Sequence, residues 1–195
     1  LGIAAVGFTV TSMSLPLMFF YQLALGRTPT ESALLLIPMA LFAGGLAPVA
    51  GRLLDRIDPR LMLVPALLAV AGSLVWYALI MKPDTPVWAF LLPSALMGIG
   101  NAGMWGPLAT SATRNLPPRQ AGAGAGIYNT TRTIGSVIGS AAVAAFMQGR
   151  LQDNLPGAGS HTGDFTAGAL PSMIAGPFAT AMAQTMILPI VVIFV

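Results

Sequence analysis

Long apolar stretches alternate with short polar segments along the whole chain. Each apolar stretch has about the 20 residues that a helix needs to cross a hydrocarbon core about 30 Å thick. They do not alternate apolar and polar residues as the strands of a membrane barrel do. The pattern predicts an all-α, polytopic membrane protein with six transmembrane helices. The predicted spans are 1–22, 30–51, 60–81, 87–111, 121–147 and 172–195.

The polar segments predict the turns between these helices. Thr30 is the expected N-cap of the second helix, and Asp58-Pro59 predicts a turn with Pro59 near the start of the third. The longest polar segment, 149–171, predicts a loop on the extracytoplasmic side.

Composition supports a membrane protein and excludes several other classes. Only 8% of the 195 residues are charged, against about 25% in soluble domains. The net charge of +3 comes from basic residues scattered in ones and twos, so no nucleic-acid partner is predicted. The chain has no cysteine and one histidine, and no metal site, cofactor or enzymatic activity is expected. Both ends lie inside apolar runs, which suggests a piece of a longer protein.

The distribution of Lys and Arg predicts the orientation. The loops after the second and fourth spans hold five basic residues, and the other three loops hold three. Cytoplasmic loops carry the excess of such residues. The loops near 52–60 and 113–120 are therefore predicted to be cytoplasmic, in a multi-pass protein of the cell (inner) membrane.

The fifth span carries the strongest candidate for a functional site. Apart from residues at span ends, Arg132 is the one charged residue within the spans, roughly 15 to 20 Å from the helix start. At about 100° per residue, Arg132 shares a polar, small-residue face with Tyr128, Asn129 and Ser136. An arginine at that depth faces protein or a water-filled cavity. Three readings stay open: a structural arginine, a substrate or gating contact, and snorkelling to the surface.

The segment GRLLDRIDPR, from Gly51 to Arg60, is the second motif. Its residues Gly51, Asp55, Arg56 and Arg60 resemble the G-x-x-x-D-R-x-G-x-[RK] loop of the major facilitator superfamily, with Asp58 where the pattern has glycine. Order and spacing of the other segments resemble the fourteen-helix drug:proton antiporter branch. The most specific piece of this resemblance is the run of Gly126, Asn129, Arg132, Gly135 and Gly139.

The resemblance implies a fold and a function. The chain would be the C-terminal six-helix bundle of a proton-coupled transporter that exports hydrophobic or cationic drugs or metabolites by alternating access. Its partners would be the lipid bilayer, a small hydrophobic substrate and an N-terminal transmembrane bundle of the same polypeptide. The proton gradient would supply the energy, with the coupling carboxylate in that other bundle.

Two alternatives to a transporter half remain. The chain could be a half-size bundle that acts only as a dimer, or a non-transporting fragment or structural subunit.

The candidate residues fall into three groups. Substrate or gating candidates are Arg132, Asn129, Tyr128, Trp105, Asn101 and Gln22; loop-motif residues are Gly51, Asp55, Arg56 and Arg60; helix-packing residues are Gly126, Gly135 and Gly139.

Overall fold

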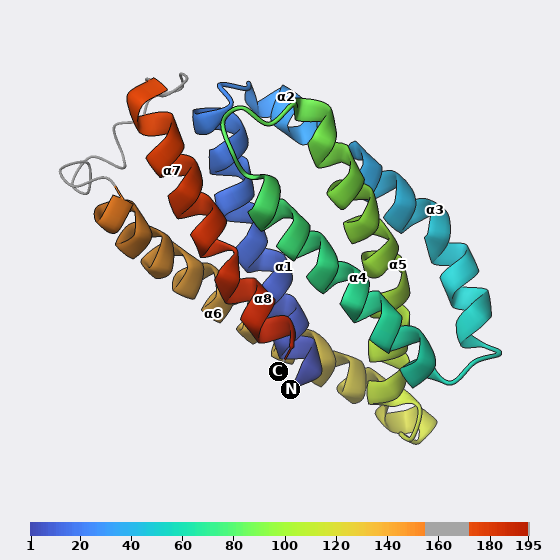
Figure 1. Cartoon of the computed structure of the whole chain (residues 1–195). Helices are drawn as coiled ribbons and strands as arrows, with labels where there is room; N and C mark the ends of the chain where they lie inside the picture. Colours follow the sequence, from blue (N-terminus) through green and yellow to red (C-terminus); the bar gives the residue numbers. More distant parts are fainter. Residues whose placement is uncertain (155–171, 195) are drawn as a thin grey trace.

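The structure, a computed structural model, describes residues 1–154 and 172–194, which form helices and turns with no strand (Figure 1). The helices, in chain order, are α1 (Gly2–Phe19), the π-helical turn η1 (Phe20–Ala24), α2 (Pro29–Leu34), α3 (Ile37–Leu54), α4 (Pro59–Ile80), η2 (Val87–Phe90), α5 (Leu91–Thr113), η3 (Pro118–Gln120), α6 (Ala121–Asn154), α7 (Ser172–Thr185) and α8 (Ile187–Ile193). These elements form six helical spans that are long and apolar enough to cross a membrane. The predicted all-α membrane fold is confirmed.

Prolines divide two of the spans into two helices each. A proline ring clashes with the carbonyl of the residue four positions earlier and provides no N–H. Counting back four positions from Pro38 gives Leu34, where α2 ends, and counting back from Pro189 gives Thr185, where α7 ends. The next helix, α3 or α8, begins within a few residues, so each span bends and continues.

The starts of the second and third spans follow from local capping. Thr28, not Thr30, is the N-cap of α2: its hydroxyl accepts from the Glu31 N–H at 3.2 Å, and the Glu31 carboxylate accepts from the Thr28 N–H at 2.9 Å. This reciprocal capping box, with Pro29 as the first helical residue, outweighs a lone threonine. Pro59 is the first residue of α4, as expected, and Asp58 is its N-cap.

The fifth helical span is longer than predicted. α6 continues to Asn154, so residues 149–154 are helical and not loop. The buried Leu151 holds this last part of the helix, and the Asn154 amide donates to the Gln184 side-chain oxygen of α7 at 3.2 Å. At 1.5 Å per residue, α6 is about 51 Å long and exceeds a bilayer core unless it tilts. The rest of the predicted extracytoplasmic loop, 155–171, lies outside the described residues.

The helices pack in two groups. α1 packs most extensively against α6 and also contacts α7 and α8, while α5 packs against α3 and α4. Where the groups meet, at the end of the bundle near η1 and η2, Phe20, Tyr21, Tyr77 and Phe90 form a buried aromatic cluster. α3 lies at the edge of the bundle and, among the described residues, buries none of its own (Figure 1).

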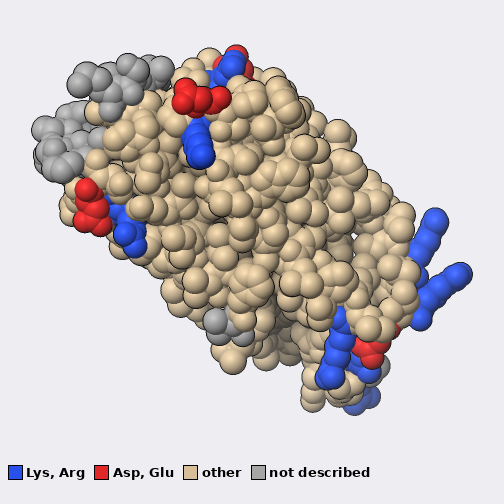
Figure 2. Space-filling view, in the orientation of Figure 1, with Lys and Arg blue, Asp and Glu red and all other residues tan. Residues whose placement is uncertain are grey.

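The charged side chains gather at the two ends of the bundle, and Figure 2 shows uncharged surface between them. One end carries five arginines and two aspartates, a net charge of +3. The described residues of the other end carry three basic and three acidic side chains, a net charge of zero. The two ends therefore differ more in net charge than in their number of basic residues.

Candidate functional site

An apolar groove of about 540 Å³ lies between α1, α3, α4 and α5. Met13, Met39 and Met62 line it from three of these helices, and Asn101 and Trp105 line it from α5. No charged side chain lines this groove. Volume and chemistry are those of a small-molecule site, which is concave, mostly apolar and provided with few polar groups.

One turn of α5 sets the orientation of the two polar side chains in the groove. The Asn101 amide nitrogen donates to the Met97 carbonyl at 3.0 Å, and the Trp105 indole N–H donates to the Asn101 amide oxygen at 3.2 Å. The i, i+4 spacing of these residues places them on one helix face. The indole is thus held in a defined position, with its N–H group already satisfied.

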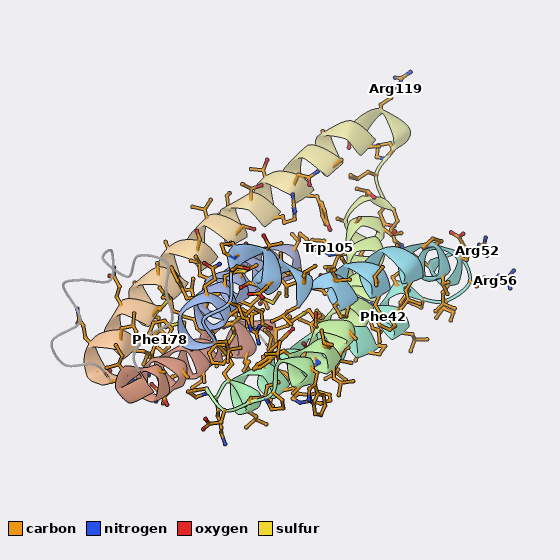
Figure 3. The ribbon with its side chains drawn as sticks, turned by 90° about the horizontal axis from the view of Figure 1, so that it is seen from above. Phe42, Arg52, Arg56, Trp105, Arg119 and Phe178 are labelled. Atoms are coloured by element: carbon orange, nitrogen blue, oxygen red, sulfur yellow. The ribbon has the colours of Figure 1, made fainter. Side chains whose placement is uncertain are left out.

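Arg132 of α6 reaches the same tryptophan from outside the groove. Its Cζ atom lies over the Trp105 ring, 5.8 Å from the centroid, within the range of a cation–π interaction. The Arg132 Nε atom is buried and has no hydrogen-bond partner within the described part of the chain. Tyr128 lies one turn earlier on α6 and is half-buried. Figure 3 labels Trp105, which lies between α6 and the rest of the bundle.

Arg132, Trp105 and Asn101 are therefore brought together, whereas Asn129 and Gln22 are not part of this group. Asn129 is exposed, and its amide donates to the Ala125 carbonyl at 3.1 Å. Gln22 is near the far end of the first span. Gly7 is the α1 residue level with Arg132, and Gln22 follows it by about 22 Å of helix.

The packing glycines of α6 differ in their surroundings. A Cβ atom on Gly139 would lie 2.7 Å from the Phe8 carbonyl oxygen of α1, and one on Gly135 would collide with the Ala4 carbonyl. A Cβ atom on Gly126 would have no neighbour within 4 Å. Gly135 and Gly139 therefore permit close contact with α1, and Gly126 faces open space in the described structure.

Sequence reasoning missed the contacts that join α1 to α6. The Ser136 hydroxyl donates to the Gly7 carbonyl at 3.2 Å. The Ser12 hydroxyl lies 2.7 Å from the Phe8 carbonyl oxygen of its own helix and 3.1 Å from the Gly139 carbonyl oxygen of α6, and shares its proton between them. Ser136 was predicted to lie on the polar face of its helix, but its partner on α1, Gly7, was not predicted. The signal in the sequence was the pairing of small residues with serines in both spans, a composition typical of close helix packing in membranes.

The residues of the loop motif lie at the arginine-rich end. Gly51 is in the last turn of α3, and Asp55, Arg56 and Arg60 are exposed. Asp55 makes no ion pair with any described residue. Asp58, which stands in place of a glycine, has φ −57° and accepts a hydrogen bond from the Arg60 N–H at 3.0 Å. This position therefore needs no left-handed backbone, and aspartate serves there as a helix cap.

The two arginine-rich loops lie next to each other. A polar pocket of about 320 Å³ joins Asp58, Pro59 and Arg60 to Ser111, Arg114 and Asn115. The loops near 52–60 and 113–120, which were both predicted to be cytoplasmic, thus meet at one end of the bundle. Figure 3 shows Arg52 and Arg56 at the tip of the α3–α4 turn, pointing away from the helices.

Comparison with known proteins places these features in a family. Residues 1–140 match the profile of the Major Facilitator Superfamily. The chain is 40% identical to the uncharacterized MFS-type transporter Rv1250 of Mycobacterium tuberculosis, with 97% of this chain and 34% of the relative covered.

Other relatives have names that refer to drug resistance. The chain is 34% identical to the puromycin resistance protein pur8 of Streptomyces alboniger, covering 64% of this chain and 25% of the relative. It is 30% identical to the multidrug resistance protein Stp of Mycobacterium tuberculosis, covering 78% of this chain and 29% of the relative. The chain thus spans about a third or less of the length of these relatives. On the profile match and the similarity to Rv1250, the chain belongs to the major facilitator superfamily of membrane transporters.

Proposed function

We propose that this chain is the C-terminal half of a proton-coupled exporter of hydrophobic or cationic compounds. The observation that carries the proposal is the meeting of Arg132 with Trp105 beside an uncharged groove of about 540 Å³. Relatives named for puromycin and multidrug resistance favour drugs or drug-like metabolites as substrates. The groove would form one wall of a central site, and the N-terminal half would form the other.

The arginine-rich end would face the cytoplasm. Its net charge of +3, against zero for the described residues of the other end, supports this orientation. Asp55 is exposed there and has no ion-pair partner among the described residues, so its carboxylate is free to contact the N-terminal half. Such a contact would help to close the cytoplasmic side during alternating access.

The proton-coupling carboxylate would lie in the N-terminal half. The two acidic residues inside the described spans, Glu31 and Asp153, both lie near span ends. Glu31 caps α2 and forms an ion pair with Arg27 at 3.6 Å, and Asp153 pairs with Arg150 at 3.9 Å. The middle of each described span holds no Asp or Glu. This absence supports the proposal that the carboxylate that changes protonation during transport lies in the N-terminal half.

Transport by the full-length protein tests the proposal. Everted membrane vesicles with an acidic interior should accumulate puromycin or another hydrophobic aromatic compound, and nigericin should abolish the accumulation by collapsing the proton gradient. Accumulation that survives nigericin would contradict proton coupling. Failure to accumulate any compound of a broad panel would contradict the exporter itself.

Residues 1–195 expressed alone provide a second test. We expect them to insert into the membrane but to give no gradient-driven transport, because the proposed coupling group and half of the site are absent. Transport by this fragment would instead support a half-size bundle that works as a dimer.

A further inference from the structure

The groove described above has a lining that discriminates between kinds of ligand. Three methionines supply flexible, polarizable surface that adapts to flat rings and makes favourable sulfur–aromatic contacts. The indole of Trp105 adds an aromatic surface. The Asn101 amide already donates one N–H to Met97 and accepts from Trp105, so one N–H and one oxygen lone pair remain as the polar groups that it can offer a ligand. The lining therefore favours apolar, aromatic groups.

The lining provides no compensation for a positive charge. None of the residues that line the groove is acidic. The π face of Trp105 is the group best suited to attract a cation, but the Arg132 guanidinium lies 5.8 Å from its centroid. A second cation near that ring would meet both a ring already polarised by Arg132 and the charge of Arg132 itself.

The Arg132 charge has no neutralising carboxylate in the described part of this chain. No described carboxylate forms an ion pair with Arg132, and its Nε atom is buried without a hydrogen-bond partner. In a site of low dielectric constant, such a charge acts over several ångströms with little screening. The guanidinium therefore places a positive potential on the tryptophan side of the groove.

We propose that this groove binds uncharged aromatic ring systems and that Arg132 makes it select against cations. Trp105 would contact the ligand directly, whereas Arg132 would act through the indole as a positioning and selectivity residue. The inference rests on the proposed function and narrows it: within the substrates of an exporter, this half of the site accepts the neutral aromatic part. Any cationic part of a ligand would bind against the other half of the transporter.

A matched pair of ligands tests the proposal. Acridine, at a mildly alkaline pH where it is uncharged, and N-methylacridinium have the same three rings and differ by a methyl group and a positive charge. Their dissociation constants would be measured with purified full-length protein in lipid nanodiscs, with empty nanodiscs correcting for partition into lipid.

The parent protein should bind acridine about tenfold more tightly than N-methylacridinium. Arg132→Gln should narrow this ratio to about twofold, mainly by strengthening the binding of the cation. Arg132→Lys, which keeps the charge, should keep most of the preference. Trp105→Ala should weaken binding of both compounds, and Trp105→Phe should weaken it less.

Trp88→Ala is the matched control for loss of a tryptophan. Trp88 lies in η2, is 67% exposed and does not line the groove, so its removal should leave both dissociation constants unchanged. Each variant would be compared by its melting temperature, and Arg132→Met, which also removes the charge, preserves the test if Arg132→Gln does not fold.

Three results would overturn the inference. The parent protein could bind the cation as tightly as acridine, the ratio could stay the same in Arg132→Gln, or Trp105→Ala could leave both affinities unchanged, as it would if neither compound entered the groove. These three results can be distinguished from results that would contradict the proposed function. An exporter that prefers the cation contradicts the selectivity alone, and a protein that binds acridine selectively but does not transport contradicts the exporter.

Discussion

The middle and the N-terminal end of α6 contain the same residue type in opposite surroundings. In the middle, Gly135 and Gly139 lie so close to the α1 backbone that neither has room for a Cβ atom. Near the N-terminal end, Gly122 and Gly126 have no neighbour within 4 Å of such an atom. A glycine pattern therefore shows that close approach is permitted, and only the structure shows which glycines another helix approaches.

The difference divides α6 into a fixed part and a projecting part. Figure 3 shows the N-terminal end of α6, near the labelled Arg119, projecting away from the other helices. Arg132 lies where the two parts meet, with the Ser136–Gly7 hydrogen bond one turn later. We infer that the fixed part stabilises this bundle and that the projecting part would contact the proposed N-terminal half.

The largest expected effect is loss of the folded bundle in Gly139→Leu. The added side chain would meet the Phe8 backbone at 2.7 to 2.8 Å, and backbone cannot move aside as a flexible side chain can. Overpacking of this kind should destabilise the full-length protein by about 3 kcal/mol or more. The monodisperse fraction and melting temperature in detergent provide the measurement, and an unchanged melting temperature would contradict the close contact.

Gly126→Leu is the matched substitution in the projecting part. With open space around it, the bundle should keep its stability to within about 0.5 kcal/mol. Transport by the full-length protein should nevertheless fall about tenfold, because the side chain would obstruct the partner bundle. Normal transport by this variant would indicate that the projecting end contacts lipid instead.

A smaller effect is expected from the two serines that join α1 to α6. Ser136→Ala removes an interhelical hydrogen bond of 3.2 Å. Ser12→Ala removes the 3.1 Å interhelical contact of a hydroxyl that also donates to Phe8 of its own helix at 2.7 Å. Such bonds in membranes contribute about 0.6 kcal/mol, so each variant should be slightly less stable than the parent. Reversible unfolding in mixed micelles would measure this, with Ser140→Ala, whose hydroxyl bonds within its own helix, as the control. A loss above about 2 kcal/mol would mean that the hydrogen bonds, and not the glycines, dominate this contact.

The smallest effect is expected at the far end of α6. The Arg150–Asp153 pair has a separation of 3.9 Å, and the Asp153 side chain is 71% exposed. Solvent and salt screen such surface pairs, so Asp153→Asn should change stability by less than about 0.5 kcal/mol. A larger change in the melting temperature would show that the fixed part of α6 depends on its end as well as on its glycines.

The fold was predictable from the sequence because span length and hydropathy are local properties. Capping was also readable: T-x-x-E at Thr28 to Glu31 is a capping-box pattern, and the prediction erred by choosing Thr30. The end of α6 was misplaced because its last turns are held by contacts with α7, which no local pattern reveals.

The site was predictable only in part. Arg132, Trp105 and Asn101 were each identified as candidates, but their meeting depends on how α5 and α6 cross. The methionines of the groove were not identified, since a methionine in an apolar span carries no signal of a cavity. The roles of all these residues remain predictions to be tested by the substitutions described above.

Transport by Arg132→Ala most directly tests the central claim that Arg132 belongs to the working part of an exporter. Initial rates of proton-driven uptake into everted vesicles would be compared at equal amounts of folded full-length protein. We predict a loss of about tenfold or more in Arg132→Ala, with insertion and melting temperature preserved, and poor recovery in Arg132→Lys, because an ammonium group lacks the broad, planar guanidinium that lies over Trp105. Parental rates in both variants would contradict the claim and leave Arg132 a residue without a part in transport.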